Sequence, residues 1–176
     1  PYTATGCKRV PGKGNTMLEC LTAKGVGTGY RWRISVSYNG GVPTESELST
    51  MTSSYEAPTL DTVSANSVGM TTREGTLITL KGTNMGPTTG HAVDVFYVSS
   101  AGSGTYMKYV GDGCTVTTKS SVIECVSQPG VGVKLQWCLR VGGQWADAWC
   151  ADYDEGTMPG LSKHTIEGMQ ANTTGS

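Results

Sequence analysis

The chain is poor in charge and in long apolar runs. Only 15% of its 176 residues are charged and the net charge is −1, so it offers neither the basic surface that binds nucleic acid nor a polybasic stripe for a membrane. No apolar run reaches the roughly 18 residues that a spanning helix needs. The sequence begins at Pro1 without an initiator Met or a signal peptide, so we expect a mature product or a segment of a longer chain.

Histidine is also scarce, which weighs against catalysis. His91 and His164 lie in predicted loops, where we expect solvated side chains. No G-x-S-x-G motif occurs, and no carboxylate pair stands in a recognisable glycosidase frame. We therefore expect a protein that is not an enzyme and that holds no cofactor.

What the sequence does have is a repeat with a period of roughly 100 residues. One copy contains Gly6-Cys7, Leu18-Glu19-Cys20, Gly25-Val26-Gly27 and Trp32, and the other contains Gly113-Cys114, Ile123-Glu124-Cys125, Gly130-Val131-Gly132 and Trp137. Tyr55 and Tyr153 open a second repeated stretch, in which Leu161-Ser162 corresponds to Val63-Ser64. This period is the size of an immunoglobulin-like domain. We expect the C-terminal part of one domain in residues 1–54, a complete domain in 55–152, and the first strand or strands of a third in 153–176.

Six cysteines indicate the compartment. No pair has the C-x-x-C spacing of a zinc or thioredoxin site, and we favour disulfides over six reduced core thiols. Two pairs hold equivalent places in the repeat, so each should bond within its own copy, which leaves the last two cysteines together. The expected bonds are Cys7–Cys20, Cys114–Cys125 and Cys138–Cys150. Disulfides place the protein outside the cell or at its surface.

Short strands with glycine-rich turns predict an all-β sandwich. Residues 30–38 alternate apolar and polar side chains and predict one half-buried strand, followed by a hairpin turn at Asn39-Gly40 and a returning edge strand in 42–54. Further strands are expected at 59–65, 76–81, 93–98, 107–110, 122–126, 134–141 and 144–150. No stretch shows a helical period.

The last predicted hairpin has an internal conflict. If Trp137, Leu139 and Val141 face the core, Cys138 faces outward, and its bond to Cys150 staples the outer surface. The same alternation turns Trp145, Asp147 and Trp149 inward, where a charge is costly without a partner. We expect a bulge or a domain contact there.

The complete repeat carries four motifs in order. They are Tyr55-x-Ala57-Pro58-Thr59-Leu60-x-x-Val63, then Gly75-Thr76-Leu77-Ile78-Thr79-Leu80-x-Gly82-Thr83-Asn84-Met85-Gly86, then Cys114 with Cys125, and Leu139-x-Val141-Gly142-Gly143. In these motifs the repeat resembles an IPT/TIG domain. The sequence departs from the family where Gly75 stands alone and Met85 replaces the usual Phe. The resemblance implies an immunoglobulin-like sandwich without enzymatic activity. The disulfides and the near-neutral charge favour its extracellular branch over its transcription factors.

The sequence suggests two additions to the polypeptide, bound calcium and covalent glycans. The calcium candidates are four acidic residues at the second boundary, Asp147, Asp152, Asp154 and Glu155. We favour a solvated acidic linker as their interpretation. Asn172-Thr173-Thr174 is an N-glycosylation sequon, and the Ser/Thr-rich stretches 49–54, 88–89 and 115–121 are candidates for O-glycans.

The partial repeats at both ends suggest assembly. A half-sandwich cannot bury its own core and leaves strand edges unpaired. A longer tandem array would complete it, and so would a strand from a second copy, although head and tail together still lack the equivalent of residues 76–106. We expect a secreted, glycosylated structural protein that joins copies of itself into filaments or stalks. The alternative is a receptor or adhesin ectodomain that binds protein or carbohydrate through Trp145, Trp149 and Tyr106; a third is an accessory domain of a carbohydrate-active enzyme.

Overall fold

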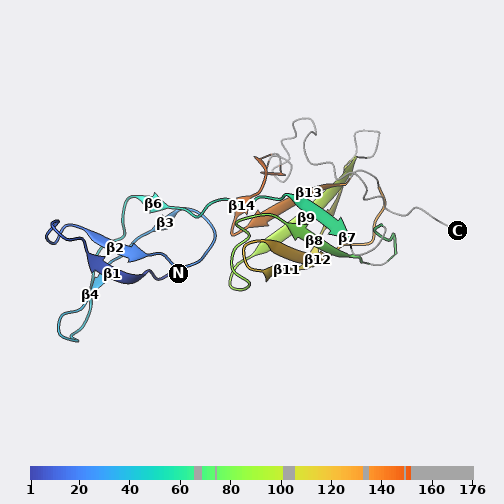
Figure 1. Cartoon of the computed structure of the whole chain (residues 1–176). Helices are drawn as coiled ribbons and strands as arrows, with labels where there is room; N and C mark the ends of the chain where they lie inside the picture. Colours follow the sequence, from blue (N-terminus) through green and yellow to red (C-terminus); the bar gives the residue numbers. More distant parts are fainter. Residues whose placement is uncertain (66–68, 74, 101–105, 133–134, 149, 152–176) are drawn as a thin grey trace.

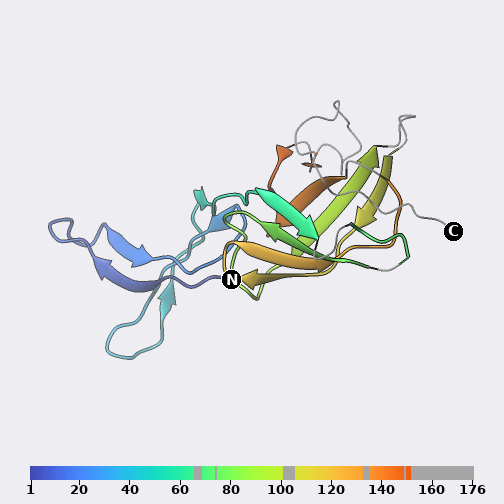
Figure 2. The same cartoon turned by 45° about the vertical axis from the view of Figure 1, so that its right-hand side comes forward.

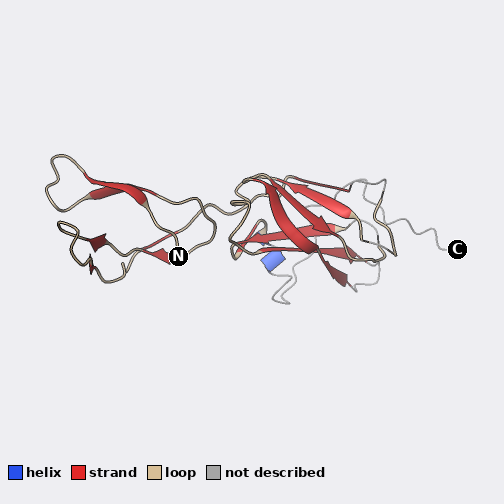
Figure 3. Cartoon of the chain, turned by 90° about the horizontal axis from the view of Figure 1, so that it is seen from below, coloured by secondary structure: helices blue, strands red, loops and turns tan. Residues whose placement is uncertain are grey.

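The computed structural model of the chain is essentially all β (Figures 1 and 3). It describes residues 1–65, 69–73, 75–100, 106–132, 135–148 and 150–151. We call residues 1–54 the small unit and residues 55–151 the large unit. The two lie one after the other, so the described part of the molecule is elongated (Figures 1 and 2).

The large unit contains two four-stranded sheets. One has the order β10-β9-β13-β14 and the other the order β11-β12-β8-β7, and all neighbouring strands are antiparallel. Its strands are β7 (Thr62–Ala65), β8 (Leu77–Lys81), β9 (Val93–Ser100), β10 (Tyr106–Val110), β11 (Asp112–Thr118), β12 (Val122–Val126), β13 (Gln136–Val141) and β14 (Gln144–Trp145).

One apolar core lies between these sheets. Alternate residues of β8 and β12 point into it, because successive side chains of a strand face opposite sides. From the opposite sheet, Trp137 stacks on Tyr97, with ring centroids 4.3 Å apart. The largest side chains of this core that are fully buried are Trp137, Tyr97, Ile78, Leu80, Met85, Ile123, Leu139, Val95 and Val141. These residues give the large unit a core of its own.

A second, smaller cluster corrects the prediction for the last hairpin. Cys138 and Cys150 form the predicted disulfide, but both are buried rather than on an outer surface. Phe96, Val98 and Trp145 cover the bond. Trp145 lies opposite Arg140, so it shares the face of Cys138 and does not point into the main core. The reason is that β14 ends at Trp145 and a short helical turn near Cys150 replaces the expected strand, which breaks the alternation (Figure 3).

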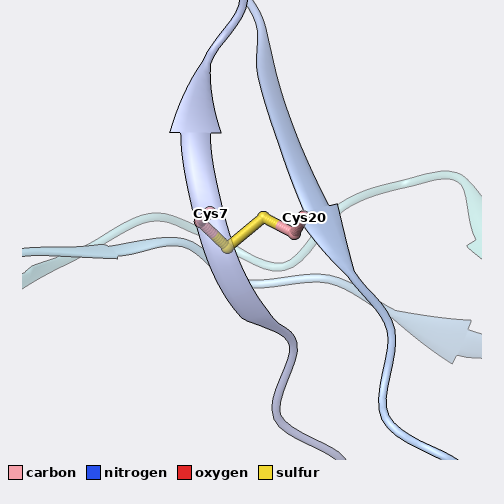
Figure 4. Close-up of a disulfide and its surroundings, with 2 residues drawn as sticks. All are labelled: Cys7 and Cys20. Atoms are coloured by element: carbon pink, nitrogen blue, oxygen red, sulfur yellow. A yellow bond between two sulfur atoms is a disulfide. The ribbon is translucent and has the colours of Figure 1, made fainter.

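The small unit consists of three two-stranded sheets. β1 pairs with β2, β3 with β6 and β4 with β5. The strands are β1 (Thr5–Arg9), β2 (Leu18–Leu21), β3 (Tyr30–Arg31), β4 (Ser35–Val36), β5 (Thr44–Glu45) and β6 (Thr52–Ser53). The predicted disulfide Cys7–Cys20 links β1 to β2 (Figure 4). The other predicted bond, Cys114–Cys125, links β11 to β12 in the same way.

These two disulfide-linked hairpins have the same geometry. Each bridges Cα atoms slightly over 4 Å apart, at 4.1 and 4.2 Å. Each has a pairing irregularity beside a glycine of positive φ, which is 64° at Gly6 and 59° at Gly113. The pairs Thr5–Leu21 and Lys8–Glu19 in one correspond to Asp112–Val126 and Thr115–Glu124 in the other. The sequence repeat is thus also a repeat of register.

Three strand predictions need correction. Residues 30–38 form two short strands with exposed apolar side chains rather than one half-buried strand, because the described residues supply no sheet to cover them. The return in 42–54 is likewise split into β5 and β6. β11 was not predicted, since its glycine, threonines and charges hide the alternation. The predicted turn at Asn39-Gly40 is present, with φ of 50° and 71° and a bond from Gly41 N to Tyr38 O.

Leu139→Ala should destabilise the large unit by about 2–5 kcal/mol, because the Leu139 side chain is 0% exposed. Leu77→Ala is the matched control: Leu77 is 40% exposed, and the same truncation there should cost less than about 1 kcal/mol. Urea unfolding of the oxidised protein measures both. Equal losses in the two variants would contradict the position of the core.

Candidate assembly interface

The small unit joins the large unit through one buried side chain. Val26 is only 4% exposed and belongs to the core cluster of the large unit. Side-chain carbons added at Gly86 or Gly142 would collide with Val26, so both glycines make room for it. Gly142 also has a φ of 57°, which glycine adopts without the cost that other residues bear. Val26 therefore acts as an apolar knob in a socket of the large unit.

A tyrosine holds the loop that presents this knob. Tyr2 Oη lies 3.1 Å from Val26 N, which donates to it, and 3.3 Å from Val26 O. A side-chain carbon at Gly25 would come within 2.5 Å of the Tyr2 ring, so the ring requires glycine there. We call Tyr2 with residues 25–27 the first clamp.

The first clamp also fixes the start of the large unit. Tyr55 donates its hydroxyl to Ala23 O at 2.6 Å and its backbone N–H to Gly27 O at 2.9 Å. The rings of Tyr2, Tyr30 and Tyr55 meet edge to face, with centroids 5.2 to 5.8 Å apart. Gln144 completes the joint, because its amide accepts from Gly27 N and donates to Tyr55 O.

The pKa values of a tyrosine and a lysine at or near this joint are shifted. Partial burial raises the pKa of Tyr30, and its neighbours Tyr2 and Tyr55 raise it further. Tyr30 donates its hydroxyl to Val26 O at 2.6 Å. At the neighbouring surface, contact with the Lys24 ammonium lowers the pKa of Lys119.

Beyond the joint, the small unit has two strand edges without a partner among the described residues. In the large unit β12 pairs with β11 on one side and β8 on the other. β2 has the place of β12 and pairs only with β1. Likewise β13 pairs with both β14 and β9, whereas β3 and β4 pair only with β6 and β5. Unpaired N–H and C=O groups on such edges are ready to take an added strand.

Apolar side chains gather beside these edges. At least two-fifths of each is exposed to solvent, which is unusual for so many large apolar groups in one small unit. They are Met17, Leu18, Leu21, Trp32, Ile34, Val36, Tyr38, Val42, Leu48 and Met51. In the large unit the counterparts of Trp32, Ile34 and Val36 are the buried residues Trp137, Leu139 and Val141. The small unit thus displays the surface that forms a core in the large one.

A groove of about 370 Å³ lies between the open strands and the tyrosine cluster. Its walls include Tyr2, Tyr30, Trp32 and Tyr55, with Arg31 and the Ser53 and Ser54 hydroxyls as polar groups. Trp32 is held by a bond from its indole N–H to Ser53 Oγ at 2.9 Å. The groove is therefore lined mainly by aromatic rings, carries a few polar groups and is open to solvent.

The candidate site residues named from the sequence do not gather into one site. Trp145 is half-buried, packs edge to face on Phe96 and lies beneath the Arg140 guanidinium. Tyr106 lies in β10, where the structure describes its backbone and not its side chain. Trp149, Asn172, Asp152, Asp154, Glu155 and His164 lie outside the described residues. Asp147 is half-buried, and within the described part of the chain no three His, Cys, Asp or Glu side chains gather as a metal site would require.

The prediction for His91 needs correction. Its side chain was expected in solvent, but it is half-buried beside Gly86, which contacts Val26. The clamp and the open groove were not predicted at all. The repeat of Gly-Val-Gly was a signal for the clamp, because the glycines are needed where Tyr2 and the backbone approach closely. Nothing in the sequence marks Tyr2 as its partner.

Comparison of the chain with known proteins identified no related protein. A scan against protein-family models found no match, and neither did searches of the curated proteins and the solved structures. The resemblance to IPT/TIG domains therefore rests on the sequence motifs alone. Among the described residues no helix is long and apolar enough to cross a bilayer.

Gly142→Ala should weaken the joint more than Gly143→Ala does. Both glycines have positive φ, so both variants bear a conformational cost of about 1–2 kcal/mol. Only the new methyl at 142 meets Val26, since nothing lies within 4 Å of the one at 143. That clash should add about 1–3 kcal/mol to the loss of unfolding free energy.

The excess should shrink when Val26→Ala is added to both variants, because the Val26 Cγ2 atom that the new methyl meets at 2.4 Å is then gone and the Val26 Cβ at 2.8 Å remains. Urea unfolding of the four variants measures it. An undiminished excess in the Val26→Ala background would show that Gly142 acts elsewhere.

Proposed function

We propose that this chain is a structural subunit of an extracellular filament or cell-surface stalk, built from tandem immunoglobulin-like sandwiches of the IPT/TIG type. The single observation that carries the proposal is the small unit, which combines two strand edges that have no partner among the described residues with ten large apolar side chains, each at least two-fifths exposed. Three disulfides fit the oxidising conditions outside the cell.

The occupant of this open face is the segment 153–176 of a second copy. Its sequence repeats the start of the large unit, with Tyr153 at the place of Tyr55 and Leu161 at the place of Val63. After a shift of one residue, Gly168-Met169 resembles Gly69-Met70. In the large unit Val63 and Met70 are buried core residues. The segment therefore carries the apolar groups that an incomplete sandwich needs.

Length also permits this donation. A chain of 24 residues extends to roughly 80 Å, whereas a five-residue strand needs roughly 17 Å. The completed small unit would still lack counterparts of β8, β9 and β10. In the large unit β8 lies between β12 and β7. Without a counterpart of β8, the donated segment, which repeats β7, pairs directly with the free edge of β2. Backbone bonds to the edge supply affinity, and alternate apolar side chains supply register.

A filament follows from the placement of the two surfaces. The acceptor lies in the small unit and the donor follows the large unit, so the contact joins different surfaces of the two copies. Such a heterologous contact adds copies without closing unless the rotation between them happens to form a ring.

Removal of the donor segment should abolish assembly. Chains of residues 1–176 should form fibres in negative-stain electron microscopy, and chains of residues 1–152 should remain single particles, because the free edge of β2 has lost its partner. A labelled peptide of residues 153–176 should bind the shortened chain, and a scrambled peptide of equal composition should not.

Fibres from the shortened chain would overturn the donation. Single particles from both chains, with a peptide that does not bind, would assign the missing strands to other residues of a longer polypeptide.

Asn172→Gln should lower the intact mass of the protein produced in a eukaryotic host by the mass of one N-glycan, because Asn172 is the acceptor of an Asn-x-Thr sequon. Asn66→Gln is the control, since Asn66-Ser67-Val68 is not a sequon and its mass change should be that of the substitution alone. An unchanged glycan mass in the Asn172 variant would place the glycans elsewhere.

A binding module is the second candidate, and the aromatic groove favours it. Aromatic rings beside hydroxyl and guanidinium groups are typical of sites that hold a small polar ligand or a peptide. In that case the groove beside Trp32, rather than Trp145, would be the binding surface of a receptor or adhesin.

A further inference from the structure

The large unit contains a second clamp with the same hydrogen bonds as the first. Tyr109 donates its hydroxyl to Val131 O at 3.1 Å and accepts from Val131 N at 3.2 Å. A side-chain carbon at Gly130 would come within 2.6 Å of the Tyr109 ring, as one at Gly25 would meet Tyr2. Gly132 has a φ of 136° where Gly27 has 100°. Tyr109 with residues 130–132 is therefore the counterpart of Tyr2 with residues 25–27.

The two knobs differ most clearly in burial. Val26 is 4% exposed and fills a socket, whereas Val131 is 49% exposed. The loop geometry that presents Val131 is as costly as that of the first clamp, since it again needs glycines at fixed places. Among the described residues no socket covers Val131, although its loop is held by the same hydrogen bonds as that of Val26.

Other apolar groups surround this knob. The large exposed apolar side chains of the large unit are Leu77, Val110, Val126 and Val131. Val126 pairs with Leu77 across the sheet, and Val110 N donates to Gln128, between Val126 and Val131. The four residues therefore adjoin one end of the unit, which is the end away from the small unit, where the segment after β12 runs (Figures 1 and 2).

The first joint shows which partner surface such a knob requires. Val26 packs against Gly142, in the turn between β13 and β14. In the small unit the corresponding turn is the hairpin between β4 and β5, since Val36–Thr44 corresponds to Val141–Gln144. Tyr38 and Val42 flank its glycines and are 84% and 93% exposed. This hairpin lies at the end of the small unit away from the large unit (Figure 1).

We infer that Val131 and its clamp form the joint between successive copies, and that the knob seats against the β4–β5 hairpin of a second copy, beside Tyr38 and Val42. This inference rests on the proposed assembly and assigns it a second contact, separate from the donated strand. The joint within the chain and the joint between chains then have one design. The contact between copies joins the far end of one large unit to the small unit of the next copy.

Single charged substitutions test each side of the joint. Val131→Asp and Val42→Asp should each raise the concentration needed for fibres roughly tenfold or more, because a charge would be buried in an apolar contact. Val131→Ile and Thr117→Asp should assemble as the unaltered chain does. The first keeps the knob apolar, and the second adds the same charge at an exposed position of β11.

A mixture excludes misfolding as the cause. The Val131→Asp chain retains an intact hairpin, and the Val42→Asp chain retains an intact knob, so together they can form one joint and no more. At a concentration below that at which either variant assembles alone, mass photometry should show monomers of each variant and dimers in the mixture.

The outcomes separate the joint from the proposed function. Fibres of the unaltered chain that Val131→Asp leaves unchanged would overturn the joint and leave the filament standing. Monomers in the mixture would also overturn the joint. Absence of fibres from the unaltered chain would overturn the assembly of separate copies, and the joint with it.

Discussion

A β-sheet is stable in water only when its strand edges are paired or protected and its apolar face is covered. The large unit covers its apolar faces almost entirely with its own residues, since both sheets close on one core around Trp137 and Leu139, to which the small unit adds Val26. The small unit has the same disulfide hairpin and the same Trp strand, but the described residues supply neither the second pairing of β2 nor a cover for the apolar side chains. The proposed strand donation follows from that difference between two copies of one design.

The sequence predicted what depends on local chemistry. The disulfide pairing followed from equivalent positions in the repeat, and the Asn39-Gly40 turn followed from its dipeptide. It failed where tertiary contacts decide. Strict alternation placed Trp145 inward, but β14 ends there and the ring instead covers the Cys138–Cys150 bond. The alternation of apolar and polar side chains in residues 30–38 predicted a half-buried strand. Burial also needs a second sheet that covers the apolar face, and the alternation does not reveal whether one is present.

The clamps show a further limit of sequence reasoning. Val26 and Val131 stand in identical Gly-Val-Gly settings, and the sequence gives no reason to treat them differently. The structure separates them, because one fills a socket made by Gly86 and Gly142 and the other meets solvent. Neither tyrosine could be assigned to its loop in advance, since Tyr2 and Tyr109 lie more than twenty residues from the valines that they bind.

An incomplete sandwich must also stay folded before a second copy binds it, and the Cys7–Cys20 disulfide stabilises the small unit in that state. Cross-linking a loop of this length removes unfolded-chain entropy worth roughly 3 kcal/mol, although the mechanism of that stabilisation is model-dependent. For β1 and β2, whose residues are exposed, this contribution replaces part of the burial that the large unit obtains from its core. The first joint adds to it, because Val26 anchors the small unit in the core of the large one. The small unit is thereby held in shape while its apolar face stays free, which is the condition that an acceptor for a second copy has to meet.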